Sequence, residues 1–362
     1  MLVDRRPQTH SVVLSLVSAF LAFSTLASTL ASTPAFARVS WQKLDLSQAI
    51  ERARIQKKQV LVDVWATWCG PCQDMEAQVF SRPDVTRAMK PLVKVRVDAD
   101  TPAGKAAIER YHVVGFPTFL LLDGEGREVD RLMGFVEPAK FIEVLAGYRQ
   151  GKGTLAELEA RFAAAGGDAE LAAAIAQRSA IRGELARAEA LLPLVLAADP
   201  KNERKLAAAT LFEVAYSGHL RLGGDPKKAE VLLAALSSGF PDAPETKRIP
   251  MALAKAARQA GDLARTRSLL DSVIAQSPGT SKVYNQVAWF CFREGYDLPF
   301  GIATARRGLE VDAKDAGLWD TLAEVLFKSG DRAGALVAIT KAVALDGKDP
   351  YFRSQTKKFS QR

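Results

Sequence analysis

The sequence predicts two domains of different class, an α/β domain over residues 38–150 and an all-α domain of stacked helical hairpins over residues 169–350. Three observations support this prediction. Runs rich in β-branched residues alternate with helical patterns in the first part of the chain. Beyond Gly151-Lys152-Gly153 the composition becomes rich in Ala and Leu with helical spacing. In that second part, glycines flanked by small residues recur at a regular interval, which is typical of a repeat architecture.

The N-terminal segment has the pattern of an export signal. Arg5 and Arg6 precede an apolar, uncharged stretch over about residues 12–30, and Ala-Phe-Ala at 35–37 follows as a small-x-small cleavage site. We expect residues 1–37 to be a signal peptide and the mature protein to begin near Arg38, in the periplasm or secreted. The alternative is an uncleaved membrane anchor, although Ser and Thr interrupt the apolar stretch.

Charge and cysteine content exclude some classes of protein. The net charge of +8 becomes +7 without residues 1–37, because Asp4, Arg5 and Arg6 together contribute +1. The remaining charges are scattered rather than clustered, which disfavours nucleic-acid binding. The three cysteines are Cys69 and Cys72, separated by two residues, and Cys291, which stands alone. This is too few for a framework of structural disulfides.

The α/β domain is expected to begin with alternating helices and strands and to end with a hairpin and a helix. The expected helices cover 46–56, 71–80, 103–111 and 138–148, and the expected strands cover 60–65, 92–97, 118–122 and 127–133. A turn at Asp123-Gly124-Glu125-Gly126 joins the last two strands. Proline is tolerated in a first helical turn, so Pro71 places the cysteine pair at a helix N-terminus.

Two cysteines at this spacing can close and reopen a small disulfide ring, which is the geometry that a redox carrier needs. A helix N-terminus stabilises a thiolate, so Cys69 is expected to attack and Cys72, one turn further in, to resolve the mixed disulfide. The alternative, half of a zinc site, requires a second Cys or His pair, but His112 and His219 are isolated. We expect no metal and no other cofactor.

Asp63 lies in an otherwise apolar strand just ahead of the cysteines. Burial without a partner would raise the pKa of its carboxyl group. A buried carboxyl near Cys72 would accept the proton when that thiol attacks, so we expect Asp63 to be catalytic. The alternative is a buried acid with a purely structural role.

The motif Trp65-Ala66-x-Trp68-Cys69-Gly70-Pro71-Cys72, followed by Gly115-Phe116-Pro117-Thr118, resembles the thioredoxin family over residues 41–149. The resemblance implies a thioredoxin fold, with a central mixed sheet flanked by helices. More narrowly, Phe-Ser-Arg-Pro-Asp-Val at 80–85 and the turn at 122–126 resemble the C-terminal domain of exported disulfide reductases of DsbD type. Gln73 departs from the family, because thioredoxins usually carry a lysine there.

The resemblance also implies roles for single residues. Asp63 would be the family's buried acid and Lys94 its lysine neighbour. Pro117 would be a cis-proline whose neighbours offer backbone groups to an extended substrate segment, as in strand addition. The substrate-binding residues expected on this basis are Trp68, Gly70, Pro71, Phe116, Pro117, Thr118 and Gly134.

Five glycines recur in the second domain at spacings of 41, 37, 34 and 35 residues: Gly183, Gly224, Gly261, Gly295 and Gly330. A small residue stands seven positions before each one: Ala176, Ser217, Ala254, Ala288 and Ala323. Another follows five or six positions after each one: Ala188, Ala229, Thr266, Gly301 and Ala335. Prolines at 200, 241 and 278 follow the first three units.

Small residues let two helices approach closely, while the glycine ends the first helix and the proline the second. About five hairpins are therefore expected. They resemble tetratricopeptide repeats, most clearly in the last unit, which has Trp319, Leu322, Ala323, Leu326, Gly330, Ala335 and Ala342. Residues 151–168 would be a linker or helix with a hinge near its start, and residues 351–362 a capping helix or tail.

The first helix of each hairpin is expected to line the concave face of the stack. Nine residues at inward positions form a possible partner groove: Arg248, Lys255, Arg258, Lys282, Asn285, Trp289, Phe292, Arg293 and Lys328. A basic groove with two aromatic side chains suits an acidic or C-terminal peptide segment. The alternative is a solvated basic face without a dedicated ligand. Cys291 is expected to be a buried structural thiol rather than a third redox centre.

Two functions from different classes fit these features. The first is an exported thiol-disulfide oxidoreductase whose repeats bind protein partners or substrates. The reducing direction is favoured because Gly-Pro between the cysteines resembles thioredoxin, which is a strong reductant. Its partners would be proteins with disulfides and a separate protein that donates or accepts electrons. The second is a periplasmic chaperone or assembly adaptor in which the thioredoxin-like domain is a redox sensor. Both depend on Cys69 and Cys72.

Overall fold

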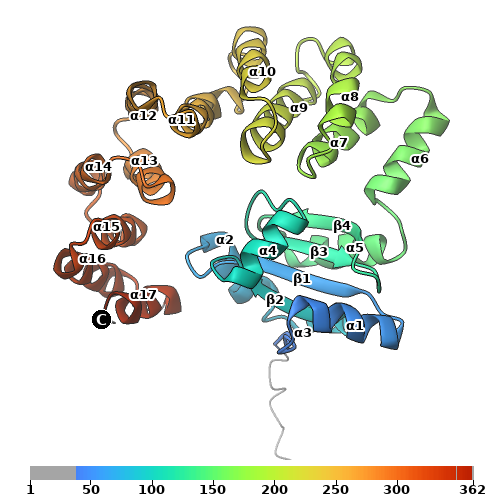
Figure 1. Ribbon diagram of the computed structural model, residues 1–362, viewed down its shortest axis with the longest axis horizontal. Coiled ribbons are helices and arrows are strands. Elements are labelled where there is room, and N and C mark those ends of the chain that lie inside the picture. Colours follow the sequence, from blue (N-terminus) through green and yellow to red (C-terminus); the bar gives the residue numbers. More distant parts are fainter. Residues whose placement is uncertain (1–37, 348, 361–362) are drawn as a thin grey trace, which may run out of the picture. The chain divides into compact units, whose positions relative to one another are not determined.

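The computed structural model describes residues 38–347 and 349–360, all of which belong to one compact unit. The predicted signal peptide and its cleavage site lie outside the described residues. The described chain forms an α/β domain followed by a series of helical pairs (Figure 1). Within the described residues, no helix combines the length and the apolar character needed to span a membrane.

A four-stranded mixed sheet forms the centre of the first domain. Its strands are β1 (Val60–Trp65), β2 (Val93–Asp98), β3 (Thr118–Leu122) and β4 (Glu128–Met133), arranged in the order β2-β1-β3-β4. β1 pairs with β2 in parallel and with β3 antiparallel, and β3 pairs with β4 antiparallel. The predicted strands at 60–65 and 118–122 and the hairpin that follows are confirmed.

Five helices flank this sheet: α1 (Leu46–Gln56), α2 (Gly70–Asp74), α3 (Pro83–Met89), α4 (Pro102–Arg110) and α5 (Pro138–Arg149). α2 continues into a π-helical turn over Met75–Val79, so the predicted helix at 71–80 is present but not regular. α3 was not predicted. Pro83 stands at its start, where a missing N–H leaves no hydrogen bond unmade.

The period of two along β1 sends alternate side chains to two separate cores. Leu61 packs with Phe80, Met89 and Phe141 on one side of the sheet. Val60, Val62 and Val64 pack with residues of α1 and α4 on the other side. Because both sides of the sheet are covered, the strand that leads to the cysteines is buried along most of its length. The result is the thioredoxin fold expected from the sequence.

Helix α6 (Leu155–Ala165) follows the α/β domain, and five helical pairs come after it. The first helices of the pairs are α7 (Ala169–Ala180), α9 (Ala207–Glu213), α11 (Ile249–Gln259), α13 (Ser281–Glu294) and α15 (Ala316–Lys328). The second helices are α8 (Leu185–Ala198), α10 (Pro226–Gly239), α12 (Leu263–Gln276), α14 (Leu298–Val311) and α16 (Arg332–Leu345). α9 continues as a π helix over Val214–Arg221, a short 3₁₀ turn at Thr246–Arg248 precedes α11, and α17 (Pro350–Ser360) follows α16. The prediction of about five tetratricopeptide-like hairpins is confirmed.

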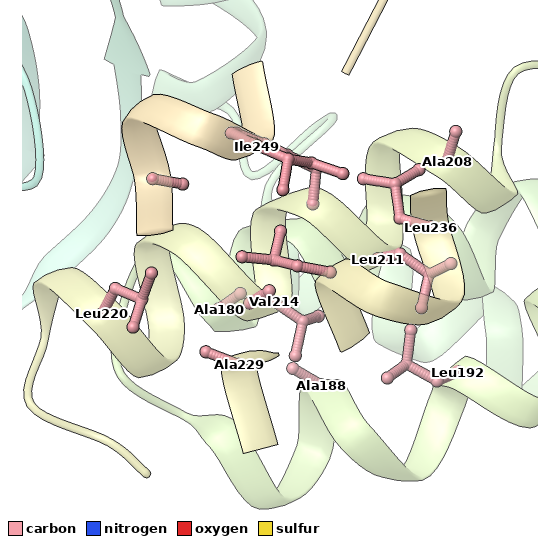
Figure 2. Close-up of a cluster of buried hydrophobic side chains, with 14 of the residues drawn as sticks. Ala180, Ala188, Leu192, Ala208, Leu211, Val214, Leu220, Ala229, Leu236 and Ile249 are labelled. Atoms are coloured by element: carbon pink, nitrogen blue, oxygen red, sulfur yellow. The ribbon is translucent and has the colours of Figure 1, made fainter. Parts of the chain in front are cut away.

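Small residues occupy the contacts between paired helices. Ala176, Ala254, Ala288 and Ala323 are fully buried, as is Ala188. Figure 2 shows the packing in the early pairs, where Ala180, Ala188, Ala208 and Ala229 lie among larger side chains such as Leu192, Leu211 and Leu236. Leucines of one helix thus fit against alanines of another, as ridges do against grooves.

The recurring glycines act in two different ways. Gly183, Gly261, Gly295 and Gly330 have positive φ and end the first helix of their pairs, as predicted. In the second pair, the residue with positive φ is Gly223, not Gly224. A Cβ at Gly224 would lie 2.6 Å from Leu185 Cδ1 and 2.7 Å from His219 Nδ1. Gly224 is therefore required by close packing, and its predicted role as the helix terminator was wrong.

Candidate redox site

Cys69 and Cys72 form a disulfide at the point where β1 leads into α2. Cys69 is the N-cap residue of α2, and its Sγ accepts a hydrogen bond from the backbone N–H of Cys72 at 3.2 Å. A donor aimed at this sulfur stabilises the thiolate after the disulfide opens. The two residues are only 5% and 2% exposed, so a substrate must reach the sulfurs through a defined opening.

Asp63 lies on β1 and is 1% exposed. Burial raises the pKa of its carboxyl group to about 6, against the opposing effect of the Arg96 guanidinium. Arg96 Nε donates to Asp63 Oδ2 at 2.8 Å, while Oδ1 is buried and has no hydrogen-bond partner among the described residues. One oxygen is thus held in place and the other is available to take a proton near neutral pH.

The lysine neighbour implied for Asp63 is a misassignment. In the β1–β2 register, Lys94 pairs with Leu61, and Arg96 is the residue opposite Asp63. Lys94 and Arg96 point to the same face of the sheet, because side chains alternate along a strand. The register therefore decides between them, and it places Arg96 directly opposite Asp63. Arg96 also binds Glu76 at 2.9 Å and lies over the Trp65 ring at 4.4 Å. The partner of Asp63 is therefore an arginine that is itself held on several sides.

The Phe116–Pro117 peptide bond is cis, as the resemblance implied. The Pro117 carbonyl accepts a hydrogen bond from Gly134 N–H at 2.8 Å, so these two residues continue the pairing of β3 with β4 beyond Thr118 and Met133. Pro117 and Thr118 are buried. Within the described chain, the backbone N–H and carbonyl of Phe116 have no hydrogen-bond partner. The backbone of Phe116 is therefore free to pair with an extended segment.

A cleft of about 480 Å³ contains the exposed side of this site. From the α/β domain it is lined by Trp68, Cys69, Gly70, Pro71, Gly115 and Phe116. From the repeats it is lined by Tyr216, Arg221, Met251, Lys255, Gln286, Trp289, Phe290, Arg293 and Glu294. The cleft brings four of the seven predicted substrate-binding residues together, while Pro117, Thr118 and Gly134 do not line it.

Trp68 connects the two sets of residues. Its Nε1 donates to Asp100 Oδ2 at 2.6 Å. The Arg293 guanidinium lies 4.0 Å from the centre of its ring, and the rings of Trp289 and Phe116 lie 5.7 Å and 5.6 Å away. Such a cluster of aromatic and cationic groups forms a defined wall beside the disulfide.

The nine residues of the predicted partner groove are not brought together. Lys255, Trp289 and Arg293 line the cleft beside Cys69. Arg248 lies over the Phe212 ring, Phe292 contacts Trp289, and Lys328 donates to the Phe292 carbonyl. Arg258 Nε and Asn285 Oδ1 are buried without a partner among the described residues, and Lys282 is exposed. A single groove through all nine is therefore not what the fold builds.

The start of the repeats is anchored to strand β4 through Asp130, which is 1% exposed. Its carboxylate accepts from Leu155 N–H at 2.6 Å and pairs with Arg182 at 2.6 Å and Arg178 at 3.2 Å. Arg131 adds a bond to the Ile181 carbonyl at 3.2 Å. A buried carboxylate with this many donors holds its partners in one arrangement. The segment predicted as a hinge, around Gly151–Gly153, is a turn next to this anchor.

Cys291 is fully buried on α13, as predicted, and is a free thiol. Burial raises the pKa of this thiol to about 12, so it remains protonated and unreactive. Its neighbour across the helical pair is Gly301, where an added Cβ would lie 2.8 Å from Cys291 Cβ. The close approach of α13 and α14 explains why the cysteine is inaccessible.

Sequence reasoning missed Arg96, Asp100 and Arg221 as residues around the site. For Arg96 the alternation along β2 was the available signal, because it leaves 94 and 96 as equal candidates. Asp100 lies in the turn between β2 and α4, and Arg221 is the last residue of the π helix Val214–Arg221. Neither residue belongs to a motif. The fold of the α/β domain brings Asp100 to Trp68, whereas Arg221 lines the cleft only because the repeats approach that domain.

The fold and the paired cysteines define a thioredoxin-like domain that carries a Cys-Xaa-Xaa-Cys disulfide. Residues 46–148 match the family model described as a thioredoxin-like domain. The domain is similar to the thiol:disulfide interchange protein DsbD of Klebsiella pneumoniae subsp. pneumoniae, at 38% identity over 30% of this chain and 18% of that protein. The chain thus spans less than a fifth of the length of the curated relatives it matches.

Two solved structures are similar to different parts of the chain. The oxidised C-terminal domain of Neisseria meningitidis DsbD matches at 30% identity and a TM-score of 0.27, over 31% of this chain and 99% of that one. YrrB, a TPR protein with an unusual peptide-binding site, matches at 14% identity and a TM-score of 0.33, over 55% of this chain and 97% of that one.

Proposed function

We propose that the protein is an exported thiol-disulfide oxidoreductase that reduces protein disulfides through a Cys69/Cys72 cycle, with repeats that contact its protein substrates. One observation carries the proposal: the Cys69–Cys72 disulfide follows β1, the strand that carries a buried carboxyl whose pKa is about 6 and which has one oxygen without a hydrogen-bond partner among the described residues. This arrangement supplies both a nucleophile and a proton acceptor.

The proposed cycle transfers two electrons. The Cys69 thiolate attacks one sulfur of a substrate disulfide, which breaks the substrate S–S bond, forms a mixed disulfide and releases the first substrate thiolate. Cys72 then loses its proton to Asp63 and attacks Cys69 Sγ. The second substrate thiolate leaves and the Cys69–Cys72 disulfide forms. A separate dithiol protein restores the reduced pair and is itself oxidised to a disulfide.

Asp63 matches the second of these steps. At pH 7 a carboxyl with a pKa of about 6 is mostly ionised, and it is still basic enough to take a proton from a thiol. Arg96 keeps the carboxylate from becoming a stronger base by stabilising its charge. The unpaired Oδ1 is the atom to which we assign the proton.

Reduction of insulin by the full-length protein with dithiothreitol as electron source tests the proposal. Wild type is expected to accelerate insulin precipitation, and Cys69→Ser to abolish this acceleration because no nucleophile remains. Cys291→Ser is the matched control, since it removes a thiol outside the site, and it should keep the wild-type rate. Equal rates for wild type and Cys69→Ser would overturn the proposal.

The stack of helical pairs supports a second candidate, a periplasmic chaperone or assembly adaptor with a redox-sensing domain. The redox state of Cys69 and Cys72 in growing cells separates the two candidates. A pair held reduced is expected of a reductase, whereas a pair held oxidised contradicts the reducing direction. Export belongs to the proposal as well, and N-terminal sequencing of the mature protein should begin at Arg38.

A further inference from the structure

We propose that the cleft between the cysteine loop, the π helix Val214–Arg221 and helices α11 and α13 selects its substrate. It accepts an extended peptide segment that carries acidic side chains next to its disulfide, and Arg221 and Arg293 bind those carboxylates. This inference rests on the proposed function and names the substrate class of the same site. It follows from the charge of the cleft, its shape and its fixed position.

The residues that line the cleft carry a net charge of +2, from Arg221, Lys255 and Arg293 against Glu294. Lys255 and Glu294 both line it, but they neutralise each other through an ion pair at 2.6 Å. Arg221 and Arg293 are exposed, and within the part of the chain that the structure describes neither forms an ion pair. Two guanidinium groups are left to bind anions, and their forked donors match carboxylates.

The Arg293 guanidinium is partly desolvated and is held against the Trp68 ring. Neighbouring atoms desolvate the guanidinium and lower its pKa, and repulsion by Arg221 acts in the same direction, against the nearby carboxylates of Asp100 and Glu294. Stacking on Trp68 fixes the plane of the group at 4.0 Å from the ring centre. A cation that is held in place, partly desolvated and next to a like charge attracts an incoming carboxylate more strongly than a freely solvated cation does.

The shape of the cleft suits a single chain. A volume of about 480 Å³ lies in the range of sites that hold small molecules or short segments, about 300–1,000 Å³, and is too small for a folded domain. The unpaired backbone N–H and carbonyl of Phe116 border the cleft and would pair with an extended backbone. Trp289, Phe290 and Met251 supply apolar contacts for the side chains between.

The position of the cleft is built into the fold at both ends of the repeats. Asp130 and its arginine partners tie α6 and α7 to strand β4. At the other end, Trp68 packs against the hydrophobic cluster of the last two helical pairs. Because both attachments involve the α/β domain, the repeats form a second wall for the disulfide and do not act only as a separate binding module.

A single-turnover experiment tests the substrate class. Full-length protein with Cys69 and Cys72 pre-reduced is mixed with either of two disulfide-linked, unfolded peptides, which have Glu or Gln at the positions flanking each cysteine. The rate of oxidation of the pair is followed by tryptophan fluorescence. Wild type is expected to react about tenfold faster with the Glu peptide, and this preference should decrease as salt is added.

Variants assign the preference to the two arginines. In Arg221→Gln with Arg293→Gln the ratio of the two rates should approach one, and in the corresponding double Lys variant most of the preference should remain. Lys227→Gln with Lys341→Gln is the control, because it removes two exposed positive charges that do not line the cleft. The control should keep the wild-type ratio, and thermal unfolding midpoints verify that all variants are folded.

The outcomes separate this inference from the proposed function. If neither peptide oxidises the pair in the wild type, the oxidoreductase proposal itself fails. If both peptides react at equal rates, or if the double Gln variant keeps the preference, only the substrate assignment is overturned. Glutathione disulfide, which also carries carboxylates, is a further arm. A rate matching that of the Glu peptide would mean that the cleft selects small anionic disulfides and not a peptide segment.

Discussion

The α/β domain and the helical repeats each bury an aspartate, and in both places burial raises the carboxyl pKa, to about 6 for Asp63 and about 7 for Asp320. Their surroundings differ. Although each aspartate keeps one buried oxygen without a hydrogen-bond partner among the described residues, Asp63 is held by one arginine and lies on the strand that leads to the cysteines. Asp320 accepts a bond from Tyr351 OH at 3.2 Å, and Tyr351 belongs to the last helix of the chain, α17.

The contacts around Asp320 serve to attach α17. Gln355 donates to Tyr351 OH at 2.7 Å, and Lys358 forms an ion pair with Glu324, one turn from Asp320 on α15. These bonds join α17 to the last helical pair. α17 then covers the apolar surface of that pair, as the exposed end of a repeat stack requires. The comparison shows that a raised pKa by itself does not identify a catalytic group. The reactive atoms nearby decide its role.

The largest expected effect is a difference in insulin reduction between variants of the two aspartates. Asp63→Asn should lower the rate of insulin reduction at pH 7 by about 10-fold to 100-fold, because the resolving thiol loses its proton acceptor. Asp320→Asn should leave the rate within about a factor of two, since it touches no reacting atom. Equal losses in the two variants would show that the effect of Asp63 is on folding rather than on chemistry.

The next effect concerns stability and its dependence on pH. Asp320 has a raised folded-state pKa, so its contribution is fully present below its ordinary value of 3.8 and is lost as the pH rises toward about 7. Asp320→Asn should therefore be more stable than wild type by about 1–3 kcal/mol at pH 8 and show no such gain at pH 4.

Urea unfolding at the two pH values measures this difference. Glu203→Gln, at an exposed carboxylate without an ion pair in the described chain, is the control and should show the same stability as wild type at both pH values. A gain for Asp320→Asn that is equally large at pH 4 would mean that it comes from packing and not from the buried charge.

A smaller effect tests which basic residue controls Asp63. Arg96→Gln removes the charge that opposes desolvation, so the pKa of Asp63 should rise above about 6. The acid limb of the pH–rate profile should then move upward by about one pH unit. Lys94→Gln should leave the profile unchanged. A shift in the lysine variant instead would restore the assignment implied by the family resemblance.

The smallest expected effect is at Cys291. In the variant with Cys69→Ser and Cys72→Ser, a thiol reagent should fail to label native Cys291 and should label it fully in denaturant, because the thiol is buried and protonated. Rapid labelling of the native protein would contradict this burial and would reopen the possibility of a third redox centre.

Much of the fold could be predicted because its signals are local. The alternation at 60–65 and the turn at 123–126 specify a strand and a hairpin through neighbouring residues alone. The repeat glycines likewise specify helix ends, although the second unit placed its positive φ at Gly223 and used Gly224 for packing. The repeat period locates a glycine within each unit. It does not show whether the glycine is there for a positive φ or because a neighbouring side chain leaves no room for a Cβ.

The candidate site could be predicted only in part, for the same reason. Cys69, Cys72, Asp63 and Pro117 lie in short motifs whose chemistry is visible in the sequence. The identification of Arg96 as the partner of Asp63 required the strand register, which pairs residues about 30 positions apart. Arg221 and Arg293 joined the cleft only because the helices that carry them lie beside Trp68.

The two domain classes, the reactive pair and the buried acid could be inferred without the structure, because hydrophobic periodicity and residue chemistry act over a few neighbouring positions. Only the tertiary structure shows which basic residue lies opposite Asp63 and which of the predicted groove residues lie near the disulfide. It also shows that two arginines without an ion pair among the described residues line the same cleft as Cys69. Those features are sums of contacts between distant segments, and the free energy of such contacts depends on packing that no local pattern contains.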